Sequence, residues 1–197
     1  MTGLLTALLR IIFSINSVIL LIGRQIAWVA LGLMVFVILL QVVARYIFNN
    51  ALPWPDEAAR FLMLWMTGLV APSAYRWGGF VAIDMVPEAL PKRVASLIYL
   101  ILFVLSAITL IVAITFGWNH TMGFGGNFNS SSLRIPLDLF GGESIKVKLR
   151  YMYGSLLLGV FLLLMVNAEL ILRTLIGLIK PDADLPKDSH MMMAGAD

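Results

Sequence analysis

Cysteine and histidine, two residue types that often bind metals and cofactors, are nearly missing from this chain of 197 residues, which has no cysteine and only two histidines, His120 and His190. The lack of cysteine excludes disulfide bonds and thiolate metal sites. A haem group held between helices usually takes two axial histidine ligands. His120 falls in the longest connection between apolar segments and His190 falls near the end of the chain, so we expect no haem and no other cofactor.

Charged residues are also scarce. They make up 13% of the chain, against roughly 25% in a soluble domain, whereas hydrophobic residues make up 60% and the mean hydropathy is +0.94. The net charge is only +3, and the basic residues are scattered at the ends of apolar segments. Nucleic acid is therefore not expected as a partner, because its binding needs a basic face. Membrane lipids are expected partners, because such residues anchor spans at the headgroups.

The apolar residues form four long runs, which predict an all-α integral membrane protein with four transmembrane helices. The clearest run, residues 25–44, has 20 residues without a charge, enough to cross a hydrocarbon core of ~30 Å. The connection over residues 117–150 is too polar and too rich in glycine to cross lipid. We place the membrane domain at residues 25–178 and a flexible cytoplasmic tail at 179–197. The predicted spans are about 25–46, 55–77, 94–118 and 151–173.

Residues 1–24 are expected to form an amphipathic helix at the membrane surface. Four polar residues follow one another at spacings of four, four and three, which places them on one helical face. They are Thr6, Arg10, Ser14 and Ser17. The alternative is an additional span, which would bring Arg10 near the bilayer centre at a cost of about 2.5–3.5 kcal/mol. We therefore favour a surface helix over residues 4–22.

The basic residues also predict an orientation. Four spans place both termini on one side of the membrane, and that side carries eight Lys and Arg residues against six on the other. Cytoplasmic loops are enriched in Lys and Arg, so we expect both termini in the cytoplasm. Residues near 45–60 then lie at the outer face, and residues near 76–84 lie at the inner face.

The second predicted span begins with charged residues. Pro55 suits the first helical position, and Asp56 and Glu57 then lie at the positive end of the helix dipole. Arg60 lies three and four residues further on, so we predict a salt-bridge network among these side chains, in preference to an acid–base pair or a cation site. The predicted outer-face cluster comprises Arg45, Trp54, Asp56, Glu57 and Arg60.

The far end of the second span carries a helix stop beside a basic residue. Paired glycines after Trp77 are expected to end the helix. On the last span, Glu169 and Arg173 are spaced to pair at i and i+4 near the helix end. The predicted inner-face cluster comprises Arg76, Gly79 and Asp84.

A stripe of small residues runs along the second span at spacings of three, three and four. Such a stripe lets another helix approach closely. It fits packing against the chain's own spans and packing against a partner, and the sequence leaves both open. The stripe comprises Gly68, Ala71, Ala74 and Gly78.

The centres of the predicted spans contain no Asp, Glu, Lys, Arg or His. A carrier usually keeps polar or broken-helix sites near the membrane midplane. We therefore expect that the chain does not carry a solute itself and that it assists a larger membrane partner. The alternatives are a small channel or carrier formed by self-association, which the stripe could support, and a membrane-bound redox or hydrolytic enzyme.

Three segments resemble the small membrane subunit, DctQ type, of tripartite ATP-independent periplasmic (TRAP) transporters. They are Gln41–Tyr46 (QVVARY), Trp54–Arg60 (WPDEAAR) and Arg76–Asp84 (RWGGFVAID). The resemblance is strongest over residues 41–91, and the four-span layout extends it over about 25–178.

Two positions depart from the family pattern. The family usually has two glutamates where this chain has Asp56 and Glu57. It usually has Gly-His where this chain has Gly79 and Phe80, so any role of that histidine is absent here.

The resemblance implies a bacterial inner-membrane protein that is not an enzyme. It would work with a large membrane subunit, which holds the sodium and substrate sites, and with a periplasmic binding protein, which delivers a dicarboxylate, sialic acid or another organic acid. The small subunit would brace the moving subunit and help to receive the binding protein. No substrate-binding, metal-binding or catalytic residue carries over, and the outer-face and inner-face clusters would serve assembly.

Overall fold

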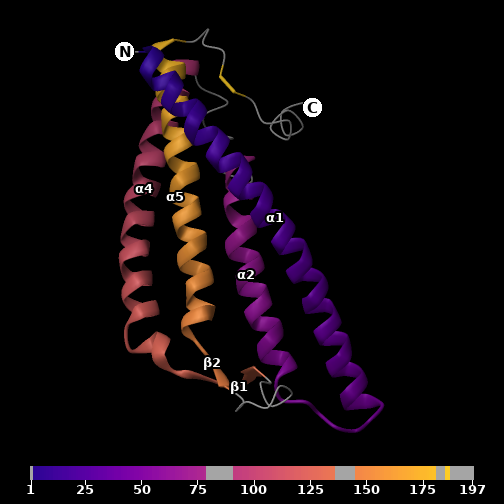
Figure 1. Ribbon diagram of the computed structural model, residues 1–197. Helices are drawn as coiled ribbons and strands as arrows, with labels where there is room; N and C mark the ends of the chain where they lie inside the picture. Colours follow the sequence, from indigo (N-terminus) through magenta and orange to yellow (C-terminus); the bar gives the residue numbers. More distant parts are fainter. Residues whose placement is uncertain (1, 79–90, 136–144, 181–184, 187–197) are drawn as a thin grey trace. The chain divides into compact units, whose positions relative to one another are not determined.

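The computed structural model describes residues 2–78, 91–135, 145–180 and 185–186. Four long helices and one antiparallel two-stranded sheet make up most of this described part (Figure 1). In chain order the elements are α1 (Thr2–Tyr46), α2 (Pro55–Arg76), α4 (Lys92–Met122), the 3-10 helix η2 (Gly125–Asn127), β1 (Asn129–Ile135), β2 (Ile145–Lys148) and α5 (Arg150–Ile179).

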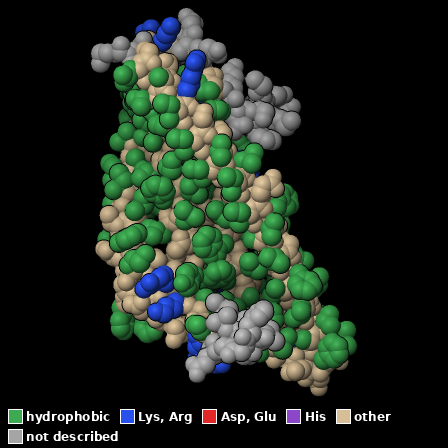
Figure 2. Space-filling model, in the orientation of Figure 1, with side chains coloured by type: hydrophobic (Ala, Val, Ile, Leu, Met, Phe, Trp, Pro, Cys, Tyr) green, Lys and Arg blue, Asp and Glu red, His purple; other side chains and the backbone are tan. Residues whose placement is uncertain are grey.

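Three helices are long and apolar enough to cross a membrane: Gly3–Tyr46, Arg93–Met122 and Arg150–Ile179. Hydrophobic side chains, green in Figure 2, cover most of the face drawn there, with few Lys and Arg residues among them. These helices confirm the predicted multi-pass membrane class. The fourth long helix of the described ranges, α2, does not meet the same criterion, so its crossing of the membrane stays a prediction.

The predicted surface helix and the predicted first span are not separate helices, while their placement in the membrane stays a prediction. α1 is a single helix of 45 residues, which makes it about 68 Å long. Gly23 lies within this helix and is buried where α1 passes α2. A Cβ added to Gly23 would lie 3.4 Å from the carbonyl oxygen of Leu69. The small residue therefore serves close helix packing at a position where the sequence analysis placed a boundary.

Helices α4 and α5 extend beyond the third and fourth predicted spans. The sequence predicted that Glu169 lies near the end of the last helix. α5 instead continues to Ile179, ten residues beyond Glu169. The connection over residues 117–150 contains the strands β1 and β2, which the sequence analysis did not predict.

The chain divides into two compact units, and each contains a part of all four long helices. Unit 1 comprises residues 1–22, 71–113 and 160–197, and unit 2 comprises residues 23–70 and 114–159. The buried apolar side chains of unit 1 include Leu9, Leu20, Leu162, Val166 and Ile176. Those of unit 2 include Ala27, Ala30 and Leu69.

The two ends of the predicted small-residue stripe differ in the structure. In unit 2, Gly68 of α2 meets Gly159 of α5 so closely that a Cβ added to Gly68 would lie 2.5 Å from the carbonyl oxygen of Ser155. This glycine therefore packs against the chain's own helix. Gly78 was wrongly included in the helical stripe, because α2 ends at Arg76 and Gly78 has a φ of 78°. That left-handed conformation confirms the predicted glycine stop.

The two strands of unit 2 pair with an irregular register. Asn129 lies opposite Lys148, and Arg134 lies opposite Lys146. Between these two pairs β1 advances by five residues while β2 advances by two. The additional residues of β1 cannot all pair with β2, so their backbone N–H groups are available to another element.

Candidate functional site

A buried carboxylate, that of Glu169 on α5, is the centre of a polar cluster in unit 1. Its side chain is fully buried. Oε1 accepts hydrogen bonds from Nε and Nη2 of Arg76 at 3.2 and 3.1 Å, and from Nε and Nη2 of Arg173 at 3.0 and 2.9 Å. Oε2 accepts one from Nδ2 of Asn16 at 2.8 Å. One carboxylate therefore joins three helices, α1, α2 and α5.

The two arginines reach this carboxylate from different directions. Arg76 is the last residue of α2, and its side chain is 1% exposed. Arg173 lies one turn after Glu169 on α5, and its side chain is 14% exposed. The predicted i,i+4 pair of Glu169 and Arg173 is confirmed. The pairing with Arg76 was missed, because 93 residues separate the two partners.

The first part of α1 completes the surroundings of the guanidinium groups. Nη1 of Arg76 donates to Oγ of Ser17 at 3.0 Å, and its Nη2 lies 3.4 Å from the carbonyl oxygen of Phe13. The Phe13 ring also faces both guanidinium carbons, at 4.5 Å from Arg76 and 5.2 Å from Arg173. Such cation–π contacts are strongest where water is excluded. The N-terminal segment thus provides part of the cluster.

A second polar contact in unit 1 includes α4. The hydroxyl of Tyr75 on α2 donates to Oδ1 of Asn167 on α5 at 2.7 Å. Nδ2 of Asn167 donates to the carbonyl oxygen of Phe103 on α4 at 2.9 Å. Together with the Glu169 cluster, these bonds link the parts of all four long helices that belong to unit 1.

The predicted inner-face cluster is found only in part. Arg76 is buried and paired with Glu169 rather than exposed at a membrane surface. Gly79 and Asp84 lie outside the described residues. Breaking a buried ion pair costs far more than breaking an exposed one, because the remaining partner keeps its charge without compensation. The role of Arg76 in unit 1 is therefore to satisfy a buried carboxylate.

Unit 2 contains a second bound carboxylate, that of Glu57 in the first turn of α2. The irregular part of β1 surrounds it: the backbone N–H groups of Ser132 and Leu133 donate to Oε2 at 2.8 and 3.1 Å. The N–H of Ser131 donates to Oε1 at 3.3 Å, and the hydroxyls of Ser131 and Ser132 also donate to this carboxylate. Successive N–H groups directed at one anion form a nest. Glu57 thus fixes β1 to α2.

The predicted salt-bridge network at the start of α2 is wrong. Glu57 binds the nest of β1, while Asp56 and Arg60 are exposed, and neither of them forms a side-chain hydrogen bond or ion pair with a described residue. Arg45 is exposed and stacks at 5.9 Å on the ring of Tyr46. Trp54 is also exposed. Within the described ranges no side-chain hydrogen bond or ion pair joins any two members of the outer-face cluster, and its role in assembly stays a prediction.

Neither cluster resembles a metal or catalytic centre. Among the described residues no group of three or more His, Cys, Asp or Glu side chains could hold a metal ion. His120 packs edge-on against the ring of Tyr153, with 4.5 Å between the ring centroids. The two carboxylates are instead bound by donors of the chain itself: Glu169 by Arg76, Arg173 and Asn16, and Glu57 by residues 131–133.

Residues 34–177 match the family model of the DctQ component of tripartite ATP-independent periplasmic transporters, which covers 144 of the 197 residues. The chain belongs to this family. A search of the curated proteins found no match.

The small TRAP subunit is thus a component of a transporter and not a member of an enzyme family. The family match includes Glu57, Arg76 and Glu169 but begins after Asn16 and Ser17. The contribution of the first part of α1 to the buried cluster is therefore a feature of this chain that lies outside the matched region.

Replacing Glu169 by glutamine should lower the free energy of unfolding of the small subunit by about 3–5 kcal/mol, because two guanidinium groups of the buried cluster lose their carboxylate. Unfolding in detergent, followed by circular dichroism, measures the change. Asp56→Asn is the matched control, since Asp56 is exposed. Equal stability of the two variants would contradict the bracing role of Glu169.

Replacing Glu57 by alanine should free the nest of β1 while α2 stays folded. Amide hydrogen exchange at residues 131–133 should accelerate about 10- to 100-fold, because hydrogen bonds to a charged group contribute about 1.5–3 kcal/mol. Asp56→Ala removes the neighbouring carboxylate, which has no such contact, and should leave these amides protected. Unchanged exchange in the Glu57 variant would show that the nest does not depend on this carboxylate.

Proposed function

We propose that the small subunit braces a sodium-coupled TRAP transporter that imports an organic acid, together with a large membrane subunit and a periplasmic substrate-binding protein. The observation that carries the proposal is the saturation of Glu169. Four guanidinium N–H contacts and one amide contact occupy its carboxylate. The negative charge of this carboxylate is balanced by two guanidinium groups, so it does not need a sodium ion, and the two arginines are directed at an acid of the same chain.

The position of Glu169 differs from what the sequence predicted for charged residues. The sequence predicted that ionisable groups stay away from the interior of the spans, whereas Glu169 lies well inside α5. Buried charges within membrane helices usually mark transport pathways. Here the full set of partners favours a structural role, because an ion pathway needs polar groups that can exchange partners during transport.

The location and cargo are proposed from charge and from the resemblance to the family. We place the subunit in the bacterial inner membrane with both termini in the cytoplasm, since the side that carries them has the greater number of Lys and Arg residues. The organic acid, such as a dicarboxylate or sialic acid, and the sodium coupling are proposed from the resemblance of the three segments to TRAP small subunits. No residue of this chain is assigned to the cargo.

A self-associating channel is less well supported. In such a channel the small-residue stripe on α2 would pack against a second copy of the chain. Gly68 packs against Gly159 within the same chain, and Gly78 is not helical, which removes the two ends of that face.

Reconstitution into liposomes tests the proposed function. The small subunit alone should show no sodium-driven uptake of organic acids, and uptake should appear when the large subunit and the binding protein are added. Glu169→Gln should lower the uptake rate of the complete system without changing the order of preferred substrates, while Asp56→Asn should leave the rate unchanged. Sodium-driven uptake by the small subunit alone would overturn the proposal, and so would a changed substrate order in the Glu169 variant.

A further inference from the structure

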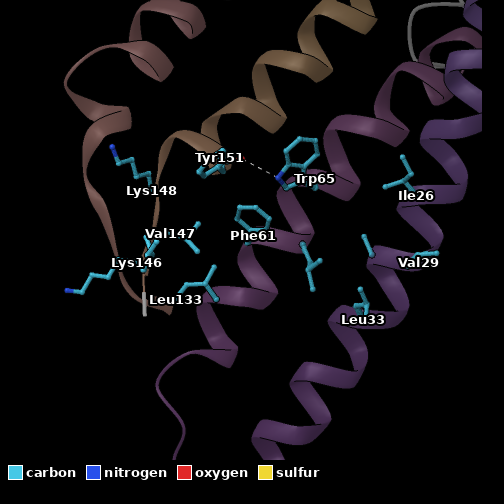
Figure 3. A pocket seen from close by; sticks show the side chains of 13 residues that line it. Ile26, Val29, Leu33, Phe61, Trp65, Leu133, Lys146, Val147, Lys148 and Tyr151 are labelled. Atoms are coloured by element: carbon cyan, nitrogen blue, oxygen red, sulfur yellow. Dashed lines mark hydrogen bonds between the residues drawn. The ribbon is translucent and has the colours of Figure 1, made fainter. Parts of the chain in front are cut away.

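Unit 2 contains a pocket of about 800 Å³ whose walls come from α1, α2, the start of α5 and the strand pair of β1 and β2, here called the hairpin (Figure 3). α1 contributes Ile26, Val29 and Leu33, and α2 contributes Phe61 and Trp65. The volume is within the range of ligand sites, which is roughly 300–1,000 Å³. The pocket is therefore large enough for a chain-like apolar ligand.

The interior of the pocket presents apolar atoms. Leu133 and Val147 of the hairpin point toward Phe61, as Figure 3 shows. The indole N–H of Trp65 is already bound, because it donates to the carbonyl oxygen of Tyr151 at 3.1 Å. On the α1 side the wall is open, since the side chain of Val29 is 64% exposed. An occupant would therefore find no polar partner inside and could enter from beside α1.

The rim of the pocket on the hairpin side is positively charged. Lys146 and Lys148 belong to the lining, but their side chains point away from the cavity, on the face of β2 opposite Val147 (Figure 3). Arg134 lies directly opposite Lys146 in the strand register. All three side chains are exposed, and no ion pair joins them to any residue that the structure describes.

Like charges directly opposite each other destabilise a two-stranded sheet. The carboxylate that β1 binds, that of Glu57, accepts from backbone and serine donors and forms no ion pair with these cations. The cationic rim is thus arranged for an anion from outside the described part of the chain.

We propose that this pocket binds an anionic phospholipid, with an acyl chain between α1 and α2 and the phosphate at Lys146, Lys148 and Arg134. A phospholipid matches both halves of the site, because its apolar chain needs no polar partner and its headgroup must stay at the rim. An acidic protein surface would match the cations but would leave the cavity unfilled. The inference requires only the membrane setting and does not depend on the transport role.

Native mass spectrometry of the full chain, reconstituted with equal amounts of phosphatidylglycerol and phosphatidylcholine, tests the site. Phosphatidylglycerol should be retained in preference, and Lys146→Gln with Lys148→Gln should reduce that preference about 25-fold, at about 1 kcal/mol for each basic residue near anionic headgroups. The matched control is Arg10→Gln with Arg93→Gln, which removes two exposed basic residues of unit 1 and should preserve the preference.

Two further measurements separate the lipid from other sources of negative charge. Val29→Trp fills the pocket at an exposed wall position and should reduce retention of both lipids, whereas excess inorganic phosphate should not displace phosphatidylglycerol. Equal retention of the two lipids, displacement by phosphate, or unchanged retention in the Val29 or lysine variants would overturn the proposal. Crosslinking of position 29 to another protein in native membranes would also overturn it, because a polypeptide would then occupy the pocket.

Discussion

The sharing of one buried carboxylate by two guanidinium groups is the interaction on which unit 1 depends. A charge removed from water is tolerated only when its partners are close and its remaining hydrogen-bonding capacity is filled. Glu169 meets both conditions, with partners from α1, α2 and its own helix. The hydrogen bonds of this ion pair require Arg76 and Glu169 to lie side by side, so they favour a packing of α2 on α5 that keeps these two residues in contact.

The same principle operates at smaller cost in unit 2. The nest of β1 surrounds Glu57 with N–H and hydroxyl groups that its partner strand cannot use, so the irregular register and the carboxylate complete each other. Both acidic side chains thus serve architecture. This use of both carboxylates agrees with the proposed role of the subunit as a brace.

Local features of the chain were predictable, and contacts between distant segments were not. The beginning of α2 at Pro55 and its glycine stop follow from short-range rules, and so does the pair of Glu169 and Arg173 on one helical face. The partner of Arg76 lies on another helix, and spacing contains no signal for it. The continuity of α1 through Gly23 was hidden for a similar reason, since this glycine is explained by the approach of α2. The hairpin was missed because its irregular strand lacks a regular alternation of apolar and polar residues.

A double-mutant cycle between Arg76 and Glu169 tests the central claim most directly. Unfolding free energies of Arg76→Ala, Glu169→Ala and the double variant give the coupling between the two side chains. If the buried pair braces unit 1, the coupling should reach about 2–3 kcal/mol, since the second substitution removes a charge that the first has left without its partner. Additive effects within about 0.5 kcal/mol would contradict the account.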